Sequence, residues 1–131
     1  IGSTSTKTLI INRQGGVEAS HSVEYPMYTP RPDMAEQDPE EIYQAVKEGI
    51  RVVMTKSHTA PSEIISVSFS SAMHSIMAVN EELEPLTRVV IFADNRSAPF
   101  VQTLRTEFDA HRIYRNTGGL RNTALTCFAH R

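Results

Sequence analysis

Residues 17–25 alternate between two kinds of side chain, and this alternation is the feature that most limits what the chain can fold into. One set is Val17, Ala19, His21, Val23 and Tyr25, and the residues between them are Glu18, Ser20, Ser22 and Glu24. A period of two places successive side chains on opposite faces of a half-buried β-strand. Residues 8–12 form a second β-rich run, and Gly15 and Gly16 mark a turn between the two. The sequence therefore predicts an antiparallel hairpin.

A helix start follows the hairpin, after a loop marked by three prolines. Asp38 is suited to cap the helix, Pro39 to its first position and Glu41 to its third. Apolar residues then recur at helical spacing, which predicts a helix to about Lys56 with one inward face. That face comprises Ile42, Ala45, Val46, Ile50, Val53 and Met54.

The remainder of the chain predicts further strands and one more helix. Residues 64–69 have the composition of a buried strand, and residues 76–79 and 86–92 predict two others. A second helix is expected over residues 96–109, with Phe100, Val101, Leu104 and Phe108 on its inner face. A three-stranded meander followed by a helix, strands and a helix indicates an α/β fold. Residues 119–131 show no clear period, so we interpret them as a loop or a disordered tail.

Composition excludes several classes of protein. The 131 residues suit one domain, and 13 basic against 15 acidic residues give a net charge of −2. This charge argues against a nucleic-acid or membrane-surface binder, and no apolar run approaches the roughly 18 residues of a spanning helix. The single cysteine, Cys127, excludes a disulfide framework and a multi-cysteine zinc site. We expect a soluble, cytoplasmic protein, and the sequence has no metal-ligand spacing.

Three polar clusters lie beside the predicted strands, and each has a structural alternative. Ser3, Thr4, Ser5 and Lys7 follow Gly2, and such residues can wrap a phosphate through N–H groups, hydroxyls and charge. The alternative is a simple Ser/Thr-rich turn. This cluster lacks the spacing of a Walker A loop.

The other two clusters are candidate ligand contacts. Within residues 70–75, His74 could hydrogen-bond a polyol hydroxyl or carboxylate and Met73 could form an apolar wall, or the segment is a tight turn. Asp94 could accept from hydroxyls and Arg96 could grip a carboxylate through two parallel bonds. The alternative there is a helix cap with an Asp–Arg surface pair.

Taken together, these segments resemble the FGGY carbohydrate kinases, and within that family the gluconate kinases. Residues 1–7 are similar to the D-I-G-T-T-S-T-K phosphate loop without its leading Asp, and residues 35–39 to the A/W-E-Q-D-P segment. Residues 70–75 read S-S-A-M-H-S, as in the gluconate kinases, where xylulose kinases have G-Q-M-H-G. Residues 92–97 resemble W-A-D-N-R-S, and residues 114–118 resemble Y-x-x-T-G. Residues 119–131 do not match.

The resemblance implies an actin-like, ribonuclease-H-like ATPase fold with ATP and sugar bound between two such domains. Residues 1–118 would be a partial N-terminal domain, and the chain a fragment that opens at Ile1 inside a motif. Ser3, Thr4, Ser5 and Lys7 would touch the ATP phosphates. The substrate contacts would be Met73, His74, Asp94 and Arg96. No metal ligand is expected here, because the motif's Mg²⁺-binding Asp would precede Ile1, and the catalytic Asp would lie beyond residue 131.

The function implied by the resemblance is ATP- and Mg²⁺-dependent phosphorylation of gluconate to 6-phosphogluconate. The substrate would be a small sugar acid, with no nucleic-acid or membrane partner, while assembly into a homo-oligomer stays open. Phosphorylation of xylulose or another polyol is an alternative, and so is a non-catalytic binding half-domain. The 131-residue chain alone is expected to be inactive.

Overall fold

The computed structural model describes residues 1–117, so the predicted tail at 119–131 lies outside the described residues. The chain divides into two compact units. The first, which we call the hairpin unit, comprises Ile1–Met27 and Gln37–Met73. The second comprises Tyr28–Glu36 and the described part of His74–Arg131.

The predicted antiparallel hairpin is confirmed, but the prediction of a three-stranded meander is wrong, because this sheet has two strands in the described chain. Strand β1 (Ser5–Ile11) pairs with β2 (Val17–Glu24), with Thr6 opposite Val23 and Ile10 opposite Ala19. The turn is held by the Asn12 side chain, whose Oδ1 accepts from the N–H groups of Gln14 at 3.1 Å and Gly16 at 2.8 Å. Strand β1 begins three residues earlier than predicted.

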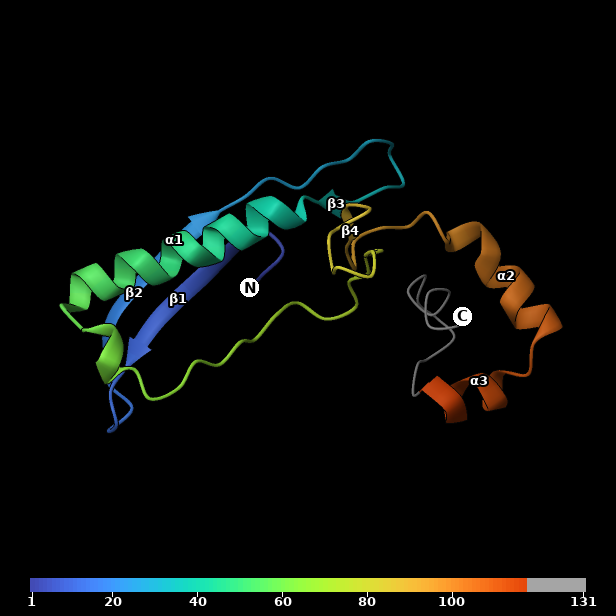
Figure 1. The fold of residues 1–131 in the computed structure, drawn as a ribbon. Helices are drawn as coiled ribbons and strands as arrows, with labels where there is room; N and C mark the ends of the chain where they lie inside the picture. Colours follow the sequence, from blue (N-terminus) through green and yellow to red (C-terminus); the bar gives the residue numbers. More distant parts are fainter. Residues whose placement is uncertain (118–131) are drawn as a thin grey trace. The chain divides into compact units, whose positions relative to one another are not determined.

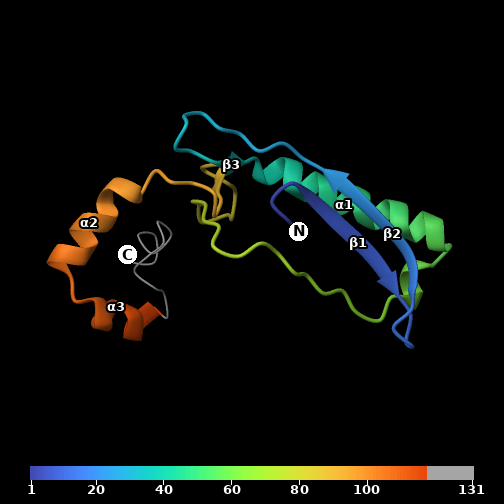
Figure 2. The ribbon, with the colours of Figure 1, turned by 180° about the vertical axis from the view of Figure 1, so that it is seen from behind.

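Helix α1 (Pro39–Ser57) covers one face of the hairpin (Figures 1 and 2). The predicted cap is confirmed, because Asp38 Oδ1 accepts from Glu40 N–H at 2.9 Å. The buried stripe runs every fourth residue through Ala45, Gly49 and Val53. Ile50, predicted to face inward, is 40% exposed, because it lies about 100° around the helix from Gly49.

Gly49 brings α1 close to strand β1. A Cβ atom built on Gly49 would overlap the Thr8 hydroxyl oxygen and lie 3.1 Å from Thr8 Cβ. Interiors of proteins are packed at the density of organic crystals, so a side chain here would have to displace its neighbour. Sequence periodicity missed this contact, because glycine carries no apolar signal.

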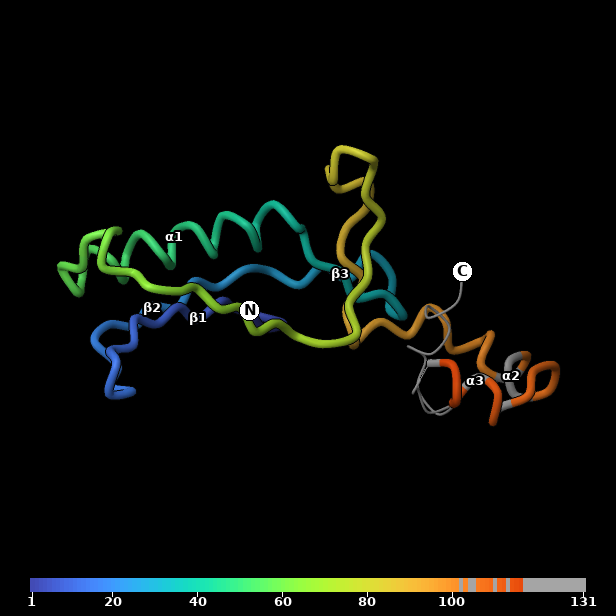
Figure 3. Tube along the Cα trace, turned by 60° about the horizontal axis from the view of Figure 1, so that its bottom comes forward, coloured from blue at the N-terminus to red at the C-terminus, as the bar shows by residue number. Residues whose placement is uncertain are grey.

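The prediction of a buried strand over residues 64–69 is wrong. The segment is extended but belongs to none of the strands found in the described chain, and its trace in Figure 3 shows no helical turn. Ile65 is 73% exposed and Phe69 is 66% exposed. Just beyond it, Ser70 O and Ala72 N–H bond the backbone of Ile1. Because no described strand pairs along residues 64–69, their apolar side chains stay uncovered.

In the second unit, the strands predicted at 76–79 and 86–92 are reduced to isolated pairings. Ile76 pairs with Val90 and Val79 with Pro85, and only β4 (Val89–Val90) counts as a strand. The other short elements of the described chain are strand β3 (Glu36–Gln37) and, in the hairpin unit, a 3₁₀ helix (Pro61–Glu63). Ile91 is 2% exposed and donates its N–H to Ala35 O at 3.2 Å.

The second predicted helix is shorter than expected, and a third helix follows it. Helix α2 spans Ala98–Glu107, and α3 spans Ala110–Thr117. Phe100 and Phe108, both predicted to face inward, are 63% and 49% exposed, while the Leu104 side chain lies outside the described ones. Asp109 Oδ1 accepts from His111 N–H at 2.9 Å, so this residue caps α3 instead of ending α2. None of the described helices has the length and apolar character needed to cross a membrane.

Candidate functional site

The first candidate is the N-terminal loop, residues 1–5, at the end of the hairpin where α1 begins (Figure 1). Its backbone closes on itself, because Gly2 N–H donates to Ser5 O at 2.8 Å. The carbonyl groups of residues 2–4 all accept hydrogen bonds from other parts of the hairpin unit. Gly2 O accepts from the Tyr25 hydroxyl at 2.7 Å, Ser3 O from Gln37 Nε2 at 2.9 Å, and Thr4 O from Tyr25 N–H at 3.1 Å.

Three buried polar side chains support this loop. Tyr25, Gln37 and Thr6 are all nearly inaccessible, with Thr6 only 3% exposed. The Thr6 hydroxyl lies 3.2 Å from the Tyr25 hydroxyl. Because Tyr25 gives its proton to Gly2 O, the Thr6 hydroxyl must be the donor to Tyr25. Hydrogen bonds in such a chain reinforce one another.

The structure brings three of the four predicted phosphate contacts into this loop. Ser3, Thr4 and Ser5 are consecutive, and Thr4 is exposed beside an open depression lined also by Glu24, Tyr25 and Pro26. Lys7 lies two residues further along β1, on the face opposite the Thr8 side chain that meets α1. It is exposed and enters none of the ion pairs found among the described residues. Three hydroxyl side chains therefore lie next to one another in this loop, and Lys7 adds one exposed ammonium further along β1.

Met73 and His74 are placed in an exposed bend. Met73 is 74% exposed, and His74 has a φ of 63°, in the left-handed region that few non-glycine residues adopt. Such backbone conformations concentrate at functional sites. The prediction that these two residues contact a sugar stays a prediction.

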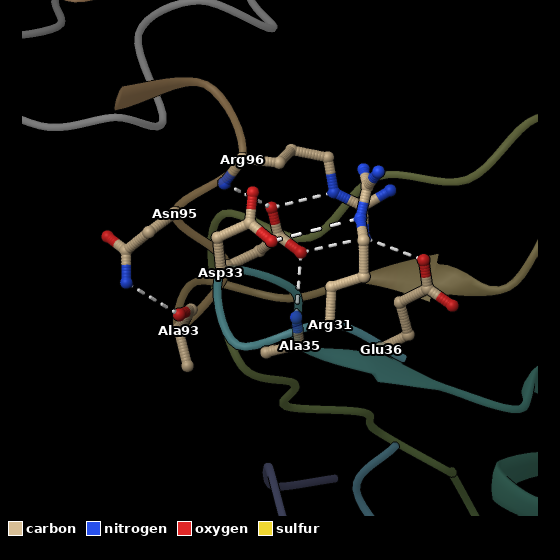
Figure 4. A network of polar contacts seen from close by, with 8 residues as sticks. Arg31, Asp33, Ala35, Glu36, Ala93, Asn95 and Arg96 are labelled. Atoms are coloured by element: carbon tan, nitrogen blue, oxygen red, sulfur yellow. Dashed lines mark hydrogen bonds and ion pairs between the residues drawn. The ribbon is translucent and has the colours of Figure 1, made fainter. Parts of the chain in front are cut away.

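The third cluster, which we call the Arg96 cluster, consists of Glu36, Asp94 and Arg96 (Figure 4). Asp94 Oδ1 accepts from Arg96 N–H at 3.0 Å and Arg96 Nε at 2.8 Å. Its Oδ2 accepts from Ala35 N–H and from Arg96 Nη2, both at 2.7 Å. Arg96 Nη2 also donates to Glu36 Oε1 at 2.6 Å. The cluster fixes residues 35–36 against the turn that follows Ile91.

These bonds set the protonation of the cluster. Burial opposes the charge on Asp94, which is 2% exposed. The hydrogen bonds from the Arg96 side chain and from the Ala35 and Arg96 N–H groups, with the Arg96 charge, nevertheless lower the pKa of Asp94 below its ordinary value. The hydrogen bonds to Asp94 and Glu36 raise the pKa of Arg96. Asp94 is therefore ionised and Arg96 positively charged at neutral pH.

The geometry limits what Asp94 and Arg96 can do for a ligand. A carboxylate offers about four acceptor sites, and Asp94 uses four bonds within the chain. The Nε and Nη2 pair of Arg96, which the sequence suggested for a substrate carboxylate, already grips Asp94. The cluster carries two carboxylates and one guanidinium, so its net charge is −1. Sequence reasoning missed Glu36, although it noted the A-E-Q-D-P segment.

The described residues offer no metal site of their own. No group of three or more His, Cys, Asp or Glu side chains within the described part of the chain is arranged to hold a metal ion. The donors in the N-terminal loop are hydroxyls and backbone N–H groups, which suit an anion. This donor set fits the phosphates of a nucleotide and does not fit a resident metal.

The fold and the N-terminal loop give the geometry, and comparison with known proteins gives the family. The model of the FGGY family of carbohydrate kinases, N-terminal domain, matches residues 1–129, and the chain belongs to this family. The predicted fold class, an α/β domain of the actin-like ATPase type, is confirmed.

Individual relatives carry the comparison further. The chain is 44% identical over 119 residues to a gluconokinase of Bacillus subtilis, covering 90% of this chain and 23% of that protein. The crystal structure of gluconate kinase from Lactobacillus acidophilus matches 95% of the chain and 24% of its own length, with TM-score 0.84 and 33% identity. Xylulose kinase from Lactobacillus acidophilus matches 90% of the chain and 24% of its own length, with TM-score 0.81 and 35% identity. The chain thus spans about a quarter of the length of these relatives.

Proposed function

We propose that this chain is the N-terminal part of an ATP-dependent sugar kinase that converts gluconate to 6-phosphogluconate. The observation that carries the proposal is the N-terminal loop, in which the Ser3 and Thr4 N–H groups have no acceptor among the described residues while the Gly2, Ser3 and Thr4 carbonyls are bonded inward. The 44% identity to a gluconokinase favours gluconate as the acceptor. The proposed setting is the cytoplasm, with ATP, Mg²⁺ and a small sugar acid as ligands.

The residues of this chain would bind and orient the nucleotide. Ser3, Thr4 and Ser5 would donate hydrogen bonds to phosphate oxygens, and Lys7 would add positive charge near them. Bound Mg²⁺ would neutralise charge on the phosphates. Met73 and His74 would lie along the sugar. Asp94 and Arg96 would act on the sugar pocket through the bonds of the Arg96 cluster, since their strongest polar groups are already bonded.

The test is nucleotide-dependent turnover by the gene product that carries this chain. A coupled assay of ADP release with gluconate, xylulose and glycerol should show the highest kcat/KM for gluconate. Lys7→Met should raise the KM for ATP, whereas Lys47→Met, which removes an exposed lysine stacked on Tyr43 of α1, should not. Absence of turnover with every sugar would contradict the proposal and favour a non-catalytic binding module.

Xylulose is the second candidate substrate. The xylulose kinase structure from Lactobacillus acidophilus shares 35% identity with this chain, about as much as the gluconate kinase structure. If xylulose is the substrate, the same assay should give a higher kcat/KM for this neutral ketose than for gluconate, which carries a carboxylate.

A further inference from the structure

Two buried side chains outside the N-terminal loop donate hydrogen bonds to its carbonyl groups. We propose that Tyr25 and Gln37 are positioning residues of a phosphate-binding loop, holding its carbonyls inward so that its N–H groups face the nucleotide. This inference rests on the proposed function, since it takes residues 1–5 to bind phosphate.

The argument begins with the planarity of the peptide group. In a trans peptide the C=O of one residue and the N–H of the next point in opposite directions. Gly2 O points to the Tyr25 hydroxyl, so Ser3 N–H points away from it. Ser3 O points to Gln37 Nε2, so Thr4 N–H points away from that amide. None of the described residues accepts a hydrogen bond from either N–H.

The orientation of these peptide groups affects phosphate binding through electrostatics. A phosphate is stabilised by N–H donors and repelled by carbonyl oxygens, because both the phosphate and the carbonyl oxygen carry negative charge. Without Tyr25 and Gln37, rotation of a peptide group would present a carbonyl oxygen where a donor stood. The two side chains hold the loop in the donor-outward arrangement before the ligand arrives.

Burial shows that these contacts are built into the fold. Gln37 is 4% exposed and Tyr25 is 8% exposed. Gln37 directly precedes the Asp38 cap of α1, and Tyr25 directly follows β2, so both are fixed by regular elements. The Tyr25 hydroxyl is oriented further by the donated bond from Thr6.

Two conservative substitutions test the proposal in the gene product that carries this chain. Tyr25→Phe removes one hydroxyl, and Gln37→Leu removes one amide donor at similar volume. Tyr43→Phe and Gln44→Leu are matched controls, since Tyr43 lies exposed on α1 and Gln44 bonds only Glu40 on the surface. The probes are ADP with Mg²⁺, and adenosine, which lacks phosphates.

We expect each loop variant to raise the Kd for ADP by about tenfold, as the loss of one oriented hydrogen-bond network implies. The Kd for adenosine and the KM for the sugar should stay within about twofold of the wild type in both variants. The controls should bind ADP as the wild type does. Thermal unfolding of each variant shows whether it is folded at the assay temperature.

Several results would overturn the proposal. These are unchanged ADP binding in both loop variants, equal weakening of ADP and adenosine, or no ADP binding by the wild type. A wild type that binds ADP but phosphorylates no sugar would refute only the proposed function. The positioning role would then still be decided by the ratio of the ADP and adenosine affinities. A variant that no longer folds is replaced by Gln37→Met or by Thr6→Val, which removes the donor to Tyr25, and the same ratio decides.

Discussion

Replacing Asp94 by asparagine should loosen the second unit locally, and the size of the effect follows from the Arg96 cluster. Asparagine keeps one acceptor oxygen, but its NH₂ group would face two donors that Asp94 now accepts. Removing one partner of a buried ion pair costs about 3–5 kcal/mol. Arg96 retains Glu36 at 2.6 Å and is 26% exposed, so we expect a loss near the low end, about 3 kcal/mol.

Hydrogen exchange measured by mass spectrometry can detect this loss in the gene product. A loss of about 3 kcal/mol corresponds to roughly 100-fold faster exchange through local opening. The change should appear in peptides spanning residues 31–37 and 91–97, which contain the amides of Ala35, Ile91 and Asn95. Peptides from the β1–β2 hairpin should be unaffected.

The matched control is Asp33→Asn. Asp33 lies 3.9 Å from Arg31 with both side chains more than half exposed, so its loss should change exchange by less than about fivefold. If Asp94→Asn changed exchange no more than Asp33→Asn does, the cluster would not hold the two segments together, and the reasoning would fail.

Three further predictions concern stability and association. The pKa of Asp94 is lowered in the folded chain, so its stabilising effect is present above the unfolded pKa of about 4 and is lost as pH falls through the folded value. Thermal unfolding between pH 2.5 and 6 should therefore show that the wild type loses stability more steeply with falling pH than Asp94→Asn does. Gly49→Ala should destabilise by on the order of 1 kcal/mol, because overpacking of about 1–3 kcal/mol exceeds the helix gain of about 1. In urea titrations Thr8→Ala should reduce that penalty, whereas Glu48→Ala should be neutral or stabilising. The 131-residue chain alone should self-associate in light scattering through exposed apolar side chains such as Ile65 and Phe69, and polar replacements there should reduce the association.

Local signals in the sequence predicted the regular elements of the hairpin unit. The alternation over residues 17–25 and the Asp38-Pro39 start each act within a few residues, and both are confirmed. Each describes a pattern that a single strand or helix terminus satisfies by itself. Such signals need no knowledge of which distant segment provides the partner.

Predictions of burial, which depend on a segment that is distant in the sequence, were wrong more often. The composition of residues 64–69 indicates burial, yet what buries a strand is another segment, and no described one pairs along it. Phe100 has helical spacing with its neighbours, but spacing alone cannot say that a core faces it. The sequence predicts a helix that ends at Asp109, although an Asp that precedes a helical run is equally a cap for the next helix.

The polar sites join residues that lie still further apart in the sequence, and no periodic pattern of residues marks them. Gln37 reaches a carbonyl 34 residues earlier, and Arg96 reaches a carboxylate 60 residues earlier. A sequence reading can name candidate donors and acceptors, but it cannot show which of them are already bonded. Arg96 is an example. Its charge suggests that it binds a substrate carboxylate, but in the structure its Nε and Nη2 groups bind the carboxylate of Asp94.

The segment from Ala35 to Pro39 shows why such a short motif is specific. The Ala35 N–H bonds Asp94, Glu36 bonds Arg96, Gln37 bonds the N-terminal loop, and Asp38 with Pro39 starts α1. Each position needs a different chemical group, namely a backbone donor, a carboxylate, an amide donor, a capping acceptor and a fixed φ. Shifting the segment by one residue would leave a backbone donor at position 35 but would misplace the carboxylate, the amide, the cap and the proline. The order of the last four residues is therefore set by separate contacts in both units, and the start of the helix accounts for only two of them.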